Sequence, residues 1–133
     1  MKKIAFIGAG NMGGALIMGI CKAIDPQQVI IFDTDTAKVQ TLCEKTGCAA
    51  AATAEEACAA AQYVVLAVKP QVLRTVQTQL IPVMQENAKK GIQQIVVSIA
   101  AGISLEGLAE IPLANGLDLP VIRMLPNTPS EIG

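Results

Sequence analysis

The sequence predicts an α/β fold built on a doubly wound parallel sheet. Apolar runs of strand length alternate with segments whose apolar residues recur at helical spacing, which is the pattern of successive βαβ units. Hydrophobic residues make up 52% of the chain and charged residues 16%, so a substantial core can form. A length of 133 residues fits one domain of ordinary size.

The expected elements follow from these runs and from the residues that begin and end helices. The strands are expected at residues 3–7, 29–33, 48–50, 63–68, 95–99 and 121–124. The helices are expected at residues 12–23, from 35 or 36 to 47, from 53 onward, at 72–80 and at 104–110. Right-handed crossovers between these strands give the order 3-2-1-4-5-6 and place ligands at the carboxyl ends of strands one and four.

Several residues mark the ends of the helices. Asp35 or Thr36 can cap the second helix, and Gly47 follows its last turn in the position that favours glycine. Thr53 and Glu56 stand at capping-box spacing, so the alanine-rich stretch around them is expected to be a short helix. Pro82 is expected to end or kink the helix that precedes it.

The charge distribution argues against nucleic acid and membranes as partners. The net charge is −1 and aromatic residues are 2% of the chain, so the protein offers neither a basic stripe nor a base-stacking platform. Lys2 and Lys3 precede an uncharged run, which is also the pattern at the start of a signal peptide. The glycines of that run fit a strand, a turn and a helix start better than an apolar targeting helix. We therefore expect a soluble, cytoplasmic protein.

The four cysteines include no Cys-x-x-Cys pair, and the chain has no histidine, so a metal site is not expected. Cys21, Cys43, Cys48 and Cys58 are interpreted as small buried hydrophobic residues, because free cysteine is among the most buried residue types. This usage is typical of a reducing compartment.

The segment Gly8-Ala9-Gly10-Asn11-Met12-Gly13 is the strongest functional signal. It follows an apolar strand directly and opens a helix, and Asp33 stands twenty residues after Gly13 at the end of the second strand. This context indicates the dinucleotide-binding loop of a Rossmann-type fold, in which the first glycine allows a tight turn, the second lets backbone approach the pyrophosphate, and the third lets the helix pack closely. The helix dipole adds to the attraction for phosphate. A glycine turn without a ligand is the alternative.

Asp33 indicates which cofactor is bound. A carboxylate at this place can accept both hydroxyls of the adenosine ribose, whereas it repels a 2′-phosphate. NAD(H) is therefore favoured over NADP(H). Thr34, Thr36 and Lys38 offer donors that could hold a phosphate if Asp33 turns away, and a solvated aspartate at a strand end is the alternative without a ligand.

Two more loops are expected on the same rim of the sheet. Residues 67–71 follow the fourth strand, and residues 98–104 follow the fifth. Their small residues and a proline allow a ribose or a flat ring to approach the backbone. Lys69 could donate a proton or contact phosphate, although most lysines at strand ends are solvated.

Four motifs in order give the chain a resemblance to the pyrroline-5-carboxylate reductases. They are Ile7 to Gly13, Ala67 to Gln71, Ser98 to Ser104 and Arg123 to Pro129, and they extend over essentially the whole chain. Related hydroxyacid dehydrogenases share the first motif, whereas the later three in this order are specific. The resemblance implies that residues 1–133 are the dinucleotide-binding domain. It also implies that the family's C-terminal helical domain, which forms the dimer and much of the substrate pocket, is absent from this chain.

The resemblance implies an NAD(P)H-dependent oxidoreductase that reduces 1-pyrroline-5-carboxylate to proline, as part of proline biosynthesis, and a homodimer or higher oligomer for the full-length protein. A protonated ring imine is its own electrophile, so positioning can serve without a histidine acid. The cofactor-binding residues implied are Ile7, Gly8, Ala9, Gly10, Asn11, Met12, Gly13, Asp33, Thr34, Ala67, Val68, Lys69, Pro70, Ala100, Ala101 and Gly102. Asn127, Thr128 and Pro129 are implied on the nicotinamide and substrate side.

The sequence departs from the family in two places, and two other functions fit part of it. Many members use NADPH and carry polar or basic residues where this chain has Asp33, and Gln62 stands where an acid is usual. A 3-hydroxyacid dehydrogenase shares the first loop but not the Pro-Asn-Thr-Pro segment at residues 126–129. A non-catalytic dinucleotide-binding module is compatible with the whole sequence. The isolated chain is expected to bind the cofactor and, if it is half of a pyrroline-5-carboxylate reductase, to be inactive without the C-terminal domain.

Overall fold

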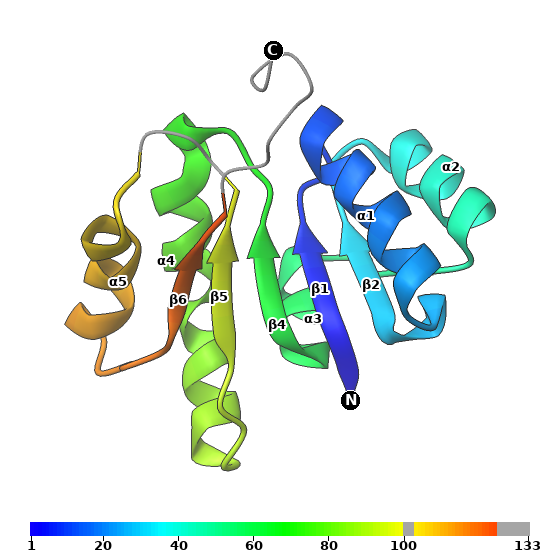
Figure 1. Cartoon of the computed structure of the whole chain (residues 1–133). Coiled ribbons are helices and arrows are strands. Elements are labelled where there is room, and N and C mark those ends of the chain that lie inside the picture. Colours follow the sequence, from blue (N-terminus) through cyan, green and yellow to red (C-terminus); the bar gives the residue numbers. More distant parts are fainter. Residues whose placement is uncertain (100–102, 125–133) are drawn as a thin grey trace.

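Six parallel strands form the central sheet of the computed structural model, which describes residues 1–99 and 103–124 (Figure 1). The strands are β1 (Lys2–Ile7), β2 (Val29–Phe32), β3 (Ala49–Ala50), β4 (Ala61–Leu66), β5 (Ile95–Ser98) and β6 (Val121–Arg123). Every neighbouring pair is parallel. The order β3-β2-β1-β4-β5-β6 confirms the predicted topology.

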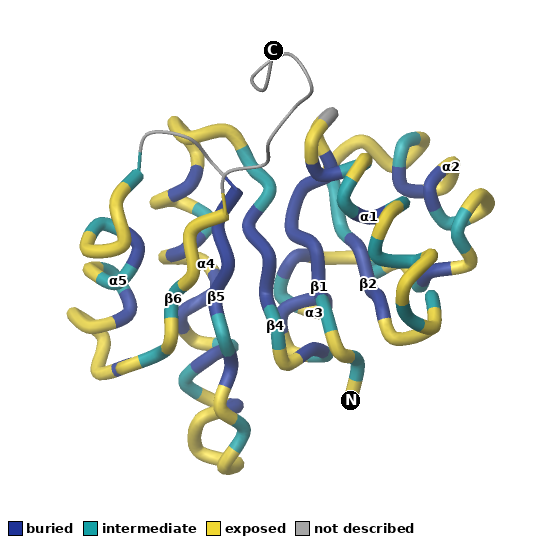
Figure 2. The backbone as a smooth tube through the Cα atoms, in the orientation of Figure 1, coloured by how far each residue is buried: buried dark blue, intermediate teal, exposed yellow. Residues whose placement is uncertain are grey.

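Helices cover both faces of this sheet. They are α1 (Asn11–Ala23), α2 (Thr36–Thr46), α3 (Ala54–Ala60), α4 (Pro70–Lys89) and α5 (Leu105–Ala114), with a 3-10 turn η1 (Pro26–Gln28) before β2. One face packs on α1 and α2 through a cluster that includes Phe6, Ile17 and Leu42. The other packs on α3, α4 and α5 through a cluster that includes Ile7 and Leu73. Figure 2 shows the buried residues concentrated along the central strands.

The continuous apolar sequence of β1 reflects its place in the middle of the sheet. Ala5, Phe6 and Ile7 are at most 2% exposed, because a central parallel strand has helices on both faces. Successive side chains alternate between the two faces, so Phe6 joins one cluster and Ile7 the other. Among the described residues, no helix combines the length and the hydrophobicity that crossing a membrane requires.

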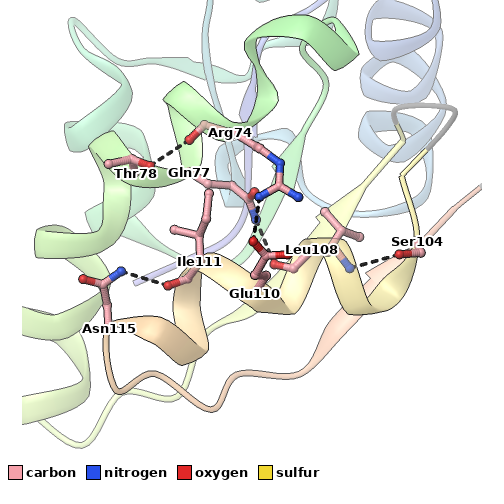
Figure 3. Close-up of polar contacts among 9 residues, drawn as sticks. Arg74, Gln77, Thr78, Ser104, Leu108, Glu110, Ile111 and Asn115 are labelled. Atoms are coloured by element: carbon pink, nitrogen blue, oxygen red, sulfur yellow. Dashed lines mark hydrogen bonds and ion pairs between the residues drawn. The ribbon is translucent and has the colours of Figure 1, made fainter.

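The helix ends that were predicted from capping residues and from Gly47 are present. The Asp35 side chain accepts the N–H of Lys38 at the start of α2, and Gly47 ends that helix in a left-handed conformation with φ +83°. Thr53 caps α3 by accepting the N–H of Glu56 at 3.0 Å. Ser104 caps α5, and Gln77 of α4 donates to the carbonyl of Leu108 at 2.9 Å, which joins α4 to α5 (Figure 3).

The predicted boundaries were wrong at α4, α5 and β4. Pro82 does not end its helix: α4 begins at Pro70 and continues to Lys89, because buried Ile81 and Met84 extend its apolar face past an exposed proline. α5 continues beyond Glu110 to Ala114 with Pro112 inside it. β4 covers Ala61–Leu66 and not residues 63–68, since Ala61 already pairs with Lys2 of β1. The other boundaries differ by a residue or so.

Candidate functional site

The four sequence motifs begin at one edge of the sheet. In the register of the strands, Phe32 pairs with Ile7, Ile7 with Leu66, Leu66 with Ser98, and Ser98 with Arg123. These five residues form one row across the sheet, at the carboxyl ends of their strands. The chain therefore leaves these strands at neighbouring points along one edge of the sheet, as the predicted topology requires (Figure 1).

Hydrogen bonds fix the first residue of each segment. The N–H groups bond to carbonyls of the row: Gly8 to Phe32 (2.7 Å), Ala67 to Ile7 (2.8 Å), Ile99 to Leu66 (3.3 Å) and Met124 to Ser98 (2.8 Å). The sheet ladder thus continues one residue into each segment. This gives the loops that would surround a ligand a rigid base.

The first and second motifs pack directly on each other. Gly8 has φ +92°, and a Cβ built on it would lie 2.6 Å from the carbonyl oxygen of Ala67. A Cβ on Gly13 would lie 3.1 Å from the Cβ of Ala67. The tight turn expected at Gly8 and the close packing expected at Gly13 are both present, and Ala67 is their common neighbour.

Gly10 differs from these two glycines because it faces open space. Among the described residues, no atom would lie within 4 Å of a Cβ on Gly10, and the residue is exposed. Gly10 precedes α1 and supplies no side-chain hydrogen bond to the start of that helix. A helix start of this kind leaves backbone N–H groups available to an anion.

Asp33 is half-buried and links the glycine loop to the start of α2. Its Oδ2 accepts the N–H of Ala9 at 2.7 Å, and its Oδ1 accepts the N–H of Asp35 at 2.9 Å. The Thr34 hydroxyl lies 3.5 Å from Oδ1. The bond to Ala9 was not predicted, because the two residues are 24 positions apart and become neighbours only through the pairing of β1 with β2.

An open groove of about 520 Å³ lies beside Asp33. Its walls include Thr36, Val39 and Cys43 of α2, and Ala51, which follows β3. This groove was not predicted, since its walls come from two segments that only the tertiary fold brings together.

The remaining predicted residues are distributed around the same edge. Lys69 is exposed and precedes Pro70, which begins α4, while Val68 is half-buried. Arg123 donates to the carbonyl of Ile103 at 3.2 Å, which ties the start of the fourth motif to the end of the third. The predicted contacts Ala100, Ala101, Gly102, Asn127, Thr128 and Pro129 lie outside the described residues.

Comparison with protein families gives a match over residues 3–102 to the family described as NADP oxidoreductase coenzyme F420-dependent. This range includes the first two motifs and most of the third.

Individual relatives carry a more specific name. The pyrroline-5-carboxylate reductase of Escherichia coli (strain K12) is 36% identical over 133 residues, which cover 98% of this chain and 46% of the relative. The structure of a pyrroline-5-carboxylate reductase from Coxiella burnetii superposes with a TM-score of 0.82 at 28% identity, covering 98% of this chain and 46% of that one. The Plasmodium falciparum pyrroline carboxylate reductase with NADP bound shares the fold, with a TM-score of 0.73 at 22% identity over 98% of this chain and 44% of that one. The chain thus spans about half the length of the relatives that it matches.

Proposed function

The chain belongs to the family described as NADP oxidoreductase coenzyme F420-dependent, and from this premise we propose that it is the dinucleotide-binding half of a pyrroline-5-carboxylate reductase. The sheet edge that carries the four motifs is the proposed cofactor site. The assignment is supported by the similarity of this chain to pyrroline-5-carboxylate reductases, which match over 98% of its length.

The contrast between Gly10 and its neighbours Gly8 and Gly13 carries the proposal. Packing against Ala67 accounts for the two outer glycines, whereas nothing in the described chain occupies the space above Gly10. A pyrophosphate fits that space, because it needs close backbone approach and the free N–H groups of a helix start. Ile7 to Met12 would hold the phosphates, and Ala67 to Pro70 with Ala100 to Gly102 would hold the nicotinamide riboside.

The proposed reaction is reduction of 1-pyrroline-5-carboxylate to proline. When bound, a reduced nicotinamide supplies the hydride. The contribution of this chain would be positioning: the row of strand ends fixes the loops, and Asn127 to Pro129 would form one wall of the substrate site. The chain has no histidine, which suits a substrate whose own protonated imine is the electrophile.

We propose NADH as the preferred cofactor. The carboxylate of Asp33 is fixed at the adenosine end by its bonds to the N–H groups of Ala9 and Asp35, so it cannot turn away without breaking both. A 2′-phosphate would then lie against a negative charge, which costs about 1 kcal/mol in water and more near a protein surface. The groove beside Asp33 offers room for the adenine.

A cytoplasmic location and a homo-oligomeric full-length protein also belong to this proposal. The four cysteines are all free, which supports a reducing setting. The oligomer rests on the family resemblance alone.

Titration calorimetry with NADH and NADPH tests cofactor binding. The chain should bind with a dissociation constant in the micromolar to millimolar range, and Gly10→Val should abolish binding because its side chain would fill the phosphate space. Gly19→Val is the matched control, since Gly19 also has open space around its Cβ but lies two turns further along α1. Equal affinity of Gly10→Val and Gly19→Val would remove the proposed cofactor site.

A second titration tests cofactor choice. Asp33→Ser should change the ratio of NADH to NADPH affinity by at least about fivefold in favour of NADPH, from the ~1 kcal/mol repulsion. An unchanged ratio would show that Asp33 does not select the cofactor, even if Asp33→Ser weakens both dinucleotides through the lost bond to Ala9.

The proposed reductase activity is tested by comparing this chain with a longer chimeric protein. The chain alone should oxidise NADH with pyrroline-5-carboxylate negligibly, whereas a chimera with the C-terminal half of the Escherichia coli relative should turn over. The reason is geometric, since well-oriented positioning contributes roughly 7–11 kcal/mol of barrier reduction and half a pocket loses most of it. Equal turnover by the two proteins would place catalysis within residues 1–133.

A further inference from the structure

Cys43 and Cys48 meet at the end of α2. Their sulfur atoms are 3.5 Å apart, although neither cysteine is paired in a disulfide. The contact is a consequence of how the helix ends. The left-handed conformation of Gly47 turns the chain back on itself, its N–H bonds to the carbonyl of Cys43 at 2.8 Å, and Cys48 is thereby placed over Cys43.

The turn between the two cysteines is held by further hydrogen bonds. The Thr46 hydroxyl donates to the carbonyl of Leu42 at 2.7 Å and accepts the N–H of Cys48 at 3.2 Å. The proximity of the sulfur atoms is therefore a fixed feature of this helix end. Cys21, from α1, is a third thiol at the same place, since its side chain interacts with Cys48 and Thr46.

A small oxidant can reach this pair from one side. Cys43 is half-buried and lines the groove beside Asp33, whereas Cys48 is only 7% exposed. Burial and the neighbouring Cys48 thiol raise the pKa of Cys43 to about 12. Because the thiolate is the reactive form, this raised pKa makes the reaction of Cys43 with an oxidant slow at neutral pH.

We propose that Cys43 and Cys48 are a redox-active pair that forms a reversible intramolecular disulfide under peroxide. In the first step the Cys43 sulfur takes one oxygen from the peroxide and becomes a sulfenic acid, while the rest of the peroxide leaves as water or an alcohol. In the second, the Cys48 sulfur attacks that sulfur, the S–S bond forms, and the oxygen leaves as water. A small thiol reductant returns both cysteines to thiols.

This disulfide would change the shape of the groove beside Asp33. Its formation does not depend on the proposed function. The sulfur atoms must close from 3.5 Å to about 2.05 Å, so the sulfur of Cys43 moves with respect to Cys48. The same groove is lined by Asp33, so the bond would alter the wall next to the carboxylate that holds the glycine loop.

Mass mapping of the whole chain tests the pairing. The protein is held in millimolar hydrogen peroxide, blocked with iodoacetamide, digested and analysed for a peptide that contains Cys43 and Cys48, has lost two hydrogen atoms and carries no alkyl group. The cross-link should accumulate slowly with time in peroxide and disappear after dithiothreitol, and its complete absence after prolonged treatment would contradict the proposal. Pairing of Cys21 with either cysteine, or oxidation of Cys43 to sulfinic acid without a cross-link, would overturn the proposal.

Substitutions of the cysteines and of Gly47 test whether the end of α2 brings the two sulfur atoms together. Cys43→Ser should abolish the cross-link, whereas Cys58→Ser should leave it intact, because Cys58 belongs to the cluster on the other face of the sheet. Gly47→Asn, which tolerates the left-handed conformation, should form the bond faster than Gly47→Val, which does not. Equal rates in the two Gly47 variants would show that the helix end does not create the pair. The wild-type mass result stands even if one variant fails to fold.

Discussion

Substitution of Gly8 by alanine should destabilise the domain strongly. Gly8 has φ +92°, a backbone conformation that costs a residue with a Cβ about 1–2 kcal/mol. The new Cβ would also lie 2.6 Å from the oxygen and 2.9 Å from the carbon of the Ala67 carbonyl, so backbone must move. Overpacking of this kind costs about 1–3 kcal/mol. The two effects add to about 2–5 kcal/mol, a large share of the ~5–15 kcal/mol typical of a domain.

Urea unfolding followed by circular dichroism measures this loss. Gly14→Ala is the matched control, because the substitution is the same and a Cβ on Gly14 meets nothing within 4 Å. Gly14 lies inside α1, where alanine is favoured over glycine by roughly 0.5–1 kcal/mol, so this variant should be at least as stable as the wild type. If Gly8→Ala unfolds at the wild-type urea concentration, the packing of the two motifs described above is incorrect.

Three other substitutions probe separate parts of the domain by the same unfolding assay. Gln94→Leu should cost about 1–3 kcal/mol, because the buried Gln94 donates at 2.8 Å to the carbonyls of Cys58 and Ala61, although the substitution also removes its buried Oε1, which has no partner among the described residues. A cost below 0.5 kcal/mol, on the order of a surface change, would contradict this. Thr53→Ala should cost about 1 kcal/mol through the lost cap on the Glu56 N–H, and Thr53→Ser should restore most of it. Burial raises the pKa of Cys58 from 9.0 to about 12, so its contribution to stability is complete below pH 9 and is lost as the pH rises towards 12, by up to about 1.4 kcal/mol per pH unit. The stability of wild type relative to Cys58→Ala should therefore decline over that range, and parallel curves would refute the assignment.

The strand order was predictable because it depends on a few rules that the sequence satisfies. Strand-length apolar runs, glycine and capping residues between them, and the right-handed crossover leave little freedom in the arrangement of a parallel sheet. The helix ends at Asp35, Gly47 and Thr53 were predictable for a similar reason, since each depends on a side chain or a backbone angle within a few residues.

The errors occurred where tertiary packing decides. Pro82 was expected to end or kink its helix. It does not end it, because the buried face of α4 continues through Ile81 and Met84 and outweighs the one lost hydrogen bond. The contact between Cys43 and Cys48 was not predicted, because the two cysteines come together only through the left-handed turn at Gly47. The Asp33 bond to Ala9 was missed because it joins two loops that are distant in the sequence.

The glycine loop has two kinds of glycine, and the distinction separates folding from binding. Gly8 and Gly13 are explained without any ligand, because a side chain at either position would press on Ala67. A loop retained for structure alone would need only these two. Gly10 has no such reason, since a side chain there would meet nothing in the described chain. The proposed dinucleotide supplies a reason for glycine at position 10, because its pyrophosphate would need to approach this backbone closely. Stability measurements on Gly8 and binding measurements on Gly10 consequently test independent statements: the first can fail while the cofactor site stands, and the second can fail while the fold stands.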